Sequence, residues 1–166
     1  EKLTPEITAV ITATLFPAQV VGLTAWGEAR ARYARGKGWL PNPIDAMADI
    51  CEVIATRTAD PRWAALGHAD VCLQRSQFSC WASAGGRDNF EAVIERAQWL
   101  IAGKEPSSKL KGGIDVAEAF MAGTHPGRLS GATHYHATWI YPPSWAAPPA
   151  VFVAEWYGHR FFRNVP

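Results

Sequence analysis

The sequence has no long apolar run and almost no net charge, and each absence narrows the classes of protein to consider. No stretch approaches the roughly 20 apolar residues that a helix needs to span a bilayer. A formal net charge of +1 offers no general attraction to nucleic acid. We therefore expect no membrane insertion and no nucleic-acid partner. A length of 166 residues with 48% hydrophobic content predicts one globular domain that buries a core.

Cysteine is also scarce. Cys51, Cys72 and Cys80 are an odd number at spacings that match no metal-ligand motif, so we expect no metal. Cys51 falls on the apolar face of a predicted helix, which favours a buried thiol. Cys72 and Cys80 could form a disulfide in an oxidising compartment, and the spacing alone leaves their pairing open. No charged start followed by an apolar core marks a secretory signal.

Helical periodicity dominates the first two thirds of the chain, and aromatic residues dominate the last third. Helices are predicted over residues 18–34, between Pro43 and Asp60, from Asp88 to Gly103 and over 116–121. The third of these is expected to begin with a capping box made by Asp88 and Glu91. Short β-rich runs follow at 134–138, 151–155 and 159–163. The fold class is therefore α+β, with a mainly helical lobe and a small antiparallel sheet.

Glu28 is the most informative residue, in the run Trp26-Gly27-Glu28-Ala29-Arg30. A carboxyl near the end of an apolar helix, beside a tryptophan, is suited to protonating a glycosidic oxygen. Regular helical geometry places Thr24 one turn before it on the same face. The alternative is a partly exposed glutamate paired with Arg32 one turn on, and the sequence does not decide between the two.

Only one carboxylate stands out, and this limits the chemistry. Most glycosidases need two carboxylates at a defined separation. After Glu118, however, the chain has only Glu155. In lytic transglycosylation one Glu suffices, because it protonates the leaving oxygen and then accepts the proton of the C6 hydroxyl that attacks the anomeric carbon. A lone Glu28 fits that reaction, and a hydrolytic, lysozyme-like muramidase is the close alternative.

Three histidines offer a different chemistry. His134 and His136 are expected on one face of a strand, and with His159 they could form the zinc site of a cell-wall peptidase. No His-Glu helix motif accompanies them, and ordinary hydrogen-bonded histidines are the alternative. A third class is a non-catalytic glycan-binding module, in which tryptophans bind the sugar and Glu28 is structural.

The ordered motifs resemble those of one family. Residues 26–30 resemble the "GEAR" signature of the SleB-type cell-wall hydrolases, the spore-cortex-lytic family. The later motifs occur in the family's order: Ile54-Ala55-Thr56-Arg57, Gln77-Phe78-Ser79, Gly131-Ala132-Thr133-His134-Tyr135-His136 and His159-Arg160-Phe161-Phe162-Arg163. The resemblance covers about residues 18–163. Two departures are Thr56, where the family usually has Asn, and a longer, more basic stretch over 32–43.

The resemblance implies a lysozyme-like or lytic-transglycosylase-like domain that cleaves peptidoglycan glycan strands at the MurNAc–GlcNAc bond, with Glu28 as the catalytic acid. Substrate binding is predicted for Trp26, Gln77, Ser79, Trp81, Thr133 and Tyr135, each of which has a core or loop-stabilising role as its alternative. We expect no cofactor and a monomer. We also expect one catalytic domain over 1–166 without a wall-binding module, and action in the periplasm or cell wall after delivery by a phage holin or particle.

Overall fold

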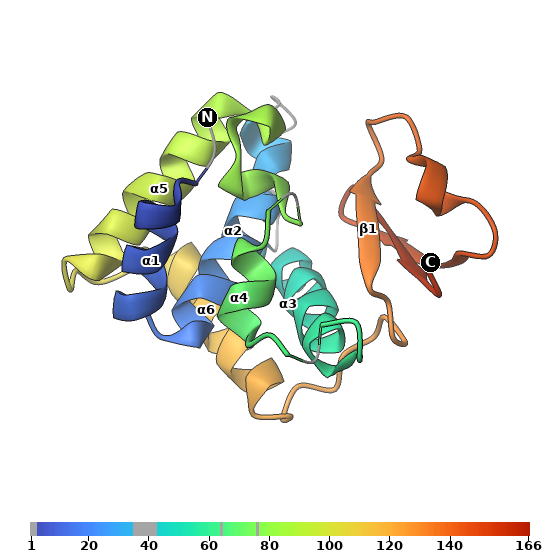
Figure 1. The fold of residues 1–166 in the computed structure, drawn as a ribbon, viewed down its shortest axis with the longest axis horizontal. Coiled ribbons are helices and arrows are strands. Elements are labelled where there is room, and N and C mark those ends of the chain that lie inside the picture. Colours follow the sequence, from blue (N-terminus) through green and yellow to red (C-terminus); the bar gives the residue numbers. More distant parts are fainter. Residues whose placement is uncertain (1–2, 35–42, 64, 76) are drawn as a thin grey trace.

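The computed structural model describes residues 3–34, 43–63, 65–75 and 77–166, and it places helices in one lobe with a small sheet beside them (Figure 1). The helices are α1 (Pro5–Thr14), α2 (Pro17–Ala34), α3 (Pro43–Ala59), α4 (His68–Leu73), α5 (Arg87–Ile101) and α6 (Ser108–Met121). The short 3-10 turns are η1 (Ser79–Trp81), η2 (Ser83–Gly85) and η3 (Ser144–Ala146). The strands are β1 (His134–Ala137), β2 (Val151–Trp156) and β3 (His159–Arg163). The predicted α+β class is confirmed, and the arrangement is consistent with a lysozyme-like lobe.

Helix α2 is the central element of the helical lobe, in contact with α3, α4, α5 and α6. Residues 20–29 are all buried and, apart from Thr24 and Glu28, are apolar or glycine, which is typical of a helix segment buried all round. The fully or almost fully buried ones include Val20, Val21, Leu23, Ala25, Trp26 and Ala29. Because residues 20–29 of α2 are buried on every side of the helix, the carboxyl of Glu28 is carried into the interior of the protein.

The close packing of α2 against α6 depends on glycine. A Cβ at Gly22 would lie 2.8 Å from the backbone N and Cα of Ile114, so the two helix backbones touch there. A Cβ at Gly113 would lie 2.8 Å from the Met47 sulfur of α3. The chain has Gly112 next to Gly113, a pair with low helix propensity, and the sequence prediction began this helix only near Val116. The structure begins it at Ser108, because tertiary contact at the glycines outweighs their propensity.

Two predicted helix ends had different outcomes. The capping box at Asp88 is wrong: α5 begins at Arg87, Gly86 is its N-cap, and Glu91 pairs instead with the Arg87 guanidinium at 2.7 Å. An i,i+4 ion pair thus takes the carboxylate that the capping box required. The predicted end at Gly103 is confirmed, since Gly103 has φ +70° and the Lys104 N–H donates to the Trp99 carbonyl, as in a Schellman motif.

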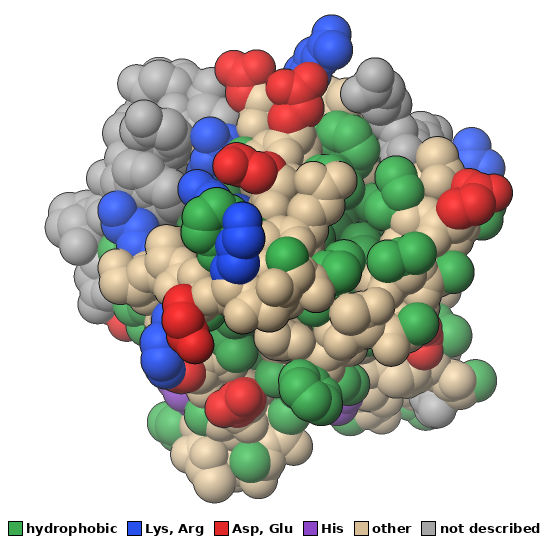
Figure 2. Space-filling view, turned by 90° about the vertical axis from the view of Figure 1, so that its left-hand side faces the viewer, with side chains coloured by type: hydrophobic (Ala, Val, Ile, Leu, Met, Phe, Trp, Pro, Cys, Tyr) green, Lys and Arg blue, Asp and Glu red, His purple; other side chains and the backbone are tan. Residues whose placement is uncertain are grey.

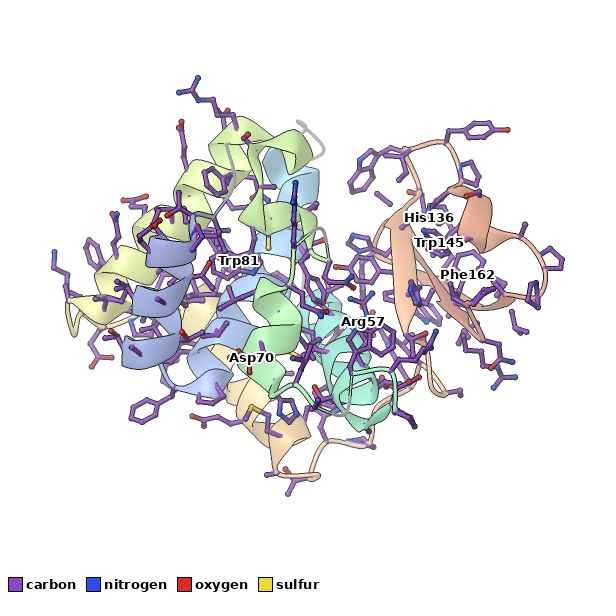
Figure 3. The ribbon with its side chains drawn as sticks, viewed as in Figure 1. Arg57, Asp70, Trp81, His136, Trp145 and Phe162 are labelled. Atoms are coloured by element: carbon purple, nitrogen blue, oxygen red, sulfur yellow. The ribbon has the colours of Figure 1, made fainter. Side chains whose placement is uncertain are left out.

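The sheet has the order β1-β3-β2 and is antiparallel throughout. Tyr135 lies opposite Phe161, and His136 lies opposite Arg160. Phe161 is fully buried in the main core, so the face that carries it is turned toward the helices. The opposite face carries His136 and Phe162, which contact Trp145 of η3 (Figure 3). All three predicted strands are confirmed to within a residue.

An ion pair and hydrogen bonds join α3 to the segment that precedes the sheet. The Arg128 guanidinium forms two hydrogen bonds of 2.7 Å with the buried Asp49 carboxylate. The Glu52 carboxylate accepts from the backbone N–H groups of Arg128 and Leu129 at 2.6 and 2.7 Å. The predicted end of α3 before Pro61 is confirmed. The pair Asn42-Pro43 predicts Asn42 as the N-cap of this helix, and Asn42 lies outside the described residues.

The three cysteines are free and buried, which confirms the buried thiol predicted for Cys51 and leaves Cys72 and Cys80 unbridged. Burial raises the pKa of Cys72 to about 12, so this thiol stays protonated.

On the face that carries α1 and α5, acidic and basic side chains are interspersed with hydrophobic ones (Figure 2). Across the described part of the chain, no helix is both long and apolar enough to cross a bilayer.

Candidate active site

The Glu28 carboxyl group lies where the helical lobe meets the sheet, and its side chain is only 4% exposed. Its Oε1 atom accepts from the Cys80 backbone N–H at 2.8 Å and from the Ser79 hydroxyl at 3.1 Å. Its Oε2 atom accepts from the Tyr135 hydroxyl at 2.8 Å. Groups from α2, η1 and β1 therefore converge on one carboxyl.

Solvent lies close to this buried group on the side of Ser79. Ser79 is exposed, whereas the neighbouring Cys80 is fully buried. Gly85 packs directly against the η1 turn that carries both residues, and a Cβ at Gly85 would collide with the Ser79 carbonyl. The turn thus directs two donors to Glu28, a backbone N–H from the buried Cys80 and a hydroxyl from the exposed Ser79. Burial raises the pKa of Tyr135, and the adjacent Glu28 raises it further, so this hydroxyl stays protonated.

The turn of α2 that carries Glu28 is itself fixed from behind. A Cβ at Gly27 would lie 2.7 Å from the Cys80 Cβ, so only glycine allows η1 to approach this closely. The fully buried Asn89 of α5 donates to the Gly27 carbonyl at 2.9 Å. Its Oδ1 atom accepts from Arg30 at 3.1 Å. Sequence reasoning missed Asn89, because no local pattern marks an asparagine that bonds another helix.

Arg57 of α3 forms a second buried polar centre beside the sheet (Figure 3). Its side chain is 4% exposed, its Nε donates to the Thr133 carbonyl at 2.6 Å, and its Nη1 donates to the Gln77 Oε1 at 2.9 Å. The guanidinium lies 5.0 Å from the ring centre of Phe78 and 5.6 Å from that of Trp63. Burial lowers the pKa of Arg57. Arg57 therefore ties α3 to the start of β1 and to the segment before η1.

The predicted binding residues fall into two groups. Ser79 and Tyr135 contact Glu28, and Gln77 is partly exposed two residues before Ser79. Trp26, Trp81 and Thr133, by contrast, are buried, with the two tryptophans only 6% and 5% exposed.

Trp81 is bonded within the core, where its Nε1 donates to the Thr24 hydroxyl at 2.9 Å. Thr24 lies one turn before Glu28, as expected, and is itself fully buried. The alternative pairing of Glu28 with Arg32 involves a side chain that lies outside the described part of the chain. Residues 35–42 of the basic stretch lie outside it as well.

The three histidines do not converge. His134 and His136 share one face of β1, as predicted, with their ring centres 5.3 and 5.9 Å from that of Trp145. His159 pairs with Ala137 in the register, so its ring lies on the other face, 5.0 Å from that of Tyr135. Among the residues that the structure describes, no three His, Cys, Asp or Glu side chains are placed to hold a metal ion. The zinc-peptidase alternative therefore lacks its ligand set.

A histidine buried in its neutral form makes stability depend on pH. Burial lowers the pKa of His159 to about 4, whereas an unfolded histidine titrates near 6.5. Below about pH 6.5, His159 binds a proton in the unfolded chain but stays neutral in the folded protein. The free energy of unfolding therefore falls as the pH drops from 6.5 toward 4. We expect His159 to reduce the free energy of unfolding by about 2 kcal/mol between pH 7.5 and pH 5.

Urea titrations of the wild type and His159→Asn at both pH values measure this loss. The variant should lose less stability than the wild type on acidification. Some pH dependence should remain, because burial also lowers the pKa of His134 to about 4. An equal loss in both proteins would show that His159 is not the group responsible.

Fold and site together define an α+β domain in which the helical lobe and the sheet meet at the buried, hydrogen-bonded carboxyl of Glu28. A family model described as Cell Wall Hydrolase matches residues 42–162, more than half of the chain. The chain belongs to this family, which confirms the resemblance to SleB-type hydrolases and makes it an enzyme that acts on peptidoglycan. The matched segment begins after Glu28, so the match does not itself cover that residue. No curated protein and no solved structure gives a significant match.

Proposed function

We propose that this enzyme cleaves the glycan strand of peptidoglycan at the MurNAc–GlcNAc bond by lytic transglycosylation, with Glu28 as acid and then base. The observation that carries the proposal is the carboxyl of Glu28, buried yet adjacent to the exposed Ser79 and held by three donors. Such an arrangement fixes a proton-transfer group in one geometry before substrate arrives. We propose further that the enzyme acts as a monomer, without a cofactor.

The hydrogen bonds suggest which oxygen carries the proton. The Cys80 backbone N–H can only donate, so Oε1 must remain an acceptor. Among the described residues, the hydrogen-bond partner found for Oε2 is the Tyr135 hydroxyl, which can rotate from donor to acceptor. In the proposed cycle, Oε2 gives its proton to the glycosidic oxygen as the C1–O bond breaks. The MurNAc C6 hydroxyl then attacks C1 and returns its proton to Glu28, giving a 1,6-anhydro end without consuming water.

The partners of other carboxylates support a mechanism with one acid. Several acidic side chains of the described residues are held by partners outside the site. Asp45 accepts from Tyr157, Asp49 and Glu52 bind the Arg128 segment, Asp60 pairs with Arg62, and Glu91, Asp115 and Glu155 form ion pairs. A retaining or inverting glycosidase would need one such group about 5–9 Å from the acid.

Product masses test the proposal. Purified peptidoglycan digested with the enzyme should release fragments that end in 1,6-anhydroMurNAc, 18 Da lighter than the hydrolytic products (about one water). Reducing ends alone would establish a muramidase and overturn the transglycosylase mechanism. Release of peptides from intact glycan strands would indicate a peptidase. Binding without any fragment would indicate a glycan-binding module.

Tyr135→Phe should lower kcat about 10- to 100-fold on peptidoglycan, because it removes the hydrogen bond to Oε2 and leaves the ring in place. The ring packs against Phe161 and His159, so the variant should fold. Initial rates of fragment release measure the loss.

Tyr157→Phe is the matched control, because the Tyr157 hydroxyl donates to the Asp45 carboxylate at 3.0 Å outside the site. It loses the same kind of hydrogen bond and should keep the wild-type rate within about threefold. Equal rates for both variants would remove Tyr135 from the proposed mechanism.

A further inference from the structure

The amide group of Gln77 has one orientation imposed by a buried cation. Its Oε1 atom accepts from the Arg57 Nη1 at 2.9 Å. A guanidinium has donors only, so the atom that faces Arg57 must be the amide oxygen. The amide NH2 is then the outer end of a partly exposed side chain, and no partner for it is found among the described residues. Gln77 therefore presents donors, and no acceptor, on the side away from Arg57.

The Arg57 side chain has little freedom to move away from the Gln77 amide oxygen. Its Nε donates to the Thr133 carbonyl at 2.6 Å, and the side chain is almost wholly buried. The rings of Phe78 and Trp63 flank the guanidinium. Within the described part of the chain, the two acceptors found for Arg57 are neutral groups, a backbone carbonyl and the Gln77 amide. Its positive charge therefore adds to the donor character of the Gln77 amide beside it.

The donor lies beside the proposed reacting group. Gln77 precedes by two residues the Ser79 that bonds Glu28. The ring between them, Phe78, lies 6.4 Å from that of Tyr135, the other side-chain donor to Glu28. A sugar bound with its glycosidic oxygen at Glu28 therefore brings its ring substituents toward Gln77.

We infer that Gln77, oriented by Arg57, recognises the carbonyl oxygen of an N-acetyl group on the glycan strand and disfavours a free amine at that position. This inference rests on the proposed glycan cleavage. An acetamido carbonyl is an acceptor and fits the NH2 donors of Gln77. An ammonium group is a donor with positive charge, so it meets two donors and the nearby charge of Arg57. Gln77 is thus a specificity residue, and Arg57 is the positioning residue behind it.

The test replaces the hydrogen-bond donors at the end of the Gln77 side chain by an acceptor. Gln77→Glu keeps the size and the bond to Arg57 but replaces the donor by an acceptor. Fully N-acetylated peptidoglycan and enzymatically de-N-acetylated peptidoglycan are the two probes. We expect kcat/KM on the acetylated polymer to fall about 10- to 100-fold, with a smaller loss or a gain on the de-N-acetylated polymer. The preference for acetylated substrate should thus fall at least about tenfold.

Gln98→Glu, on the exposed side of α5, is the matched control and should keep the wild-type preference. Arg57→Met should also weaken the preference, because it frees the Gln77 amide to turn. If that variant fails to fold, Gln77→Glu alone decides, with its thermal midpoint checked against the wild type. An unchanged preference in Gln77→Glu, with glycan cleavage intact, would overturn the inference. A wild type that releases no glycan fragments would instead overturn the proposed function.

Discussion

Glu28→Gln is expected to reduce glycan cleavage about 1,000-fold or more while leaving the fold intact. The amide oxygen of glutamine can still accept from the Cys80 N–H, and the amide nitrogen can donate to the Tyr135 hydroxyl once that hydroxyl turns. The substitution therefore keeps the packing and removes only the proton that can be transferred. Loss of turbidity of a peptidoglycan suspension and mass analysis of released fragments measure the effect.

Glu118→Gln is the matched control, because Glu118 is exposed on α6 and the same charge is removed there. It should cleave at the wild-type rate. Circular dichroism and thermal midpoints of both variants should match those of the wild type, and sedimentation with insoluble peptidoglycan should show that Glu28→Gln still binds. Wild-type cleavage by Glu28→Gln would remove the central assignment, whatever the products are.

Helix prediction succeeded where burial follows periodicity and failed where contacts between distant segments decide. Helix α2 and the apolar face of α3 could be predicted from the residues of each segment alone, and both are confirmed. Helix α1 was not predicted, because its apolar residues include the exposed Ile7 and Val10 as well as the buried Ile11. Helix α4 has only six residues, too few to show a period.

The candidate site shows a similar division. Glu28 could be singled out from its own neighbours in the chain, but its donors come from 51, 52 and 107 residues further on. One of the donors is a backbone N–H, which no residue type announces. The family motifs indicated Ser79 and Tyr135 as residues of interest, yet only the folded chain shows that both bond the same carboxyl.

The tryptophans show why composition overstates a binding surface. An aromatic residue beside a catalytic acid suggests a platform for sugars, but the same residue is also a large apolar group available to the core. Trp26 and Trp81 lie almost entirely in the core around α2, and Trp81 uses its only donor on Thr24. We propose that these two tryptophans affect the substrate indirectly, by keeping the helix that carries Glu28 rigid.

That rigidity leads to the largest expected effect on stability. Gly22→Ala should lower the free energy of unfolding by about 2–3 kcal/mol, although alanine favours a helix over glycine by about 1 kcal/mol. The new methyl group would lie 2.8 Å from the backbone of α6 at Ile114, and backbone in a packed helix cannot turn aside. The thermal midpoint should fall by about 5–10 °C. Glycan cleavage should fall too, because Glu28 lies on the same helix.

Gly112→Ala separates the effect of contact from that of helix propensity. The same methyl group on α6 would meet the Ile44 side chain, closest at its outer Cδ1 atom and with Cγ1 at 3.5 Å, and this side chain can rotate away. Propensity should then nearly balance the contact, leaving stability within about 1 kcal/mol of the wild type. Urea titrations of the two variants measure the difference. A loss for Gly22→Ala as small as that for Gly112→Ala would mean that the α2–α6 crossing yields to a methyl group, and that close helix contact is not what holds Glu28 in place.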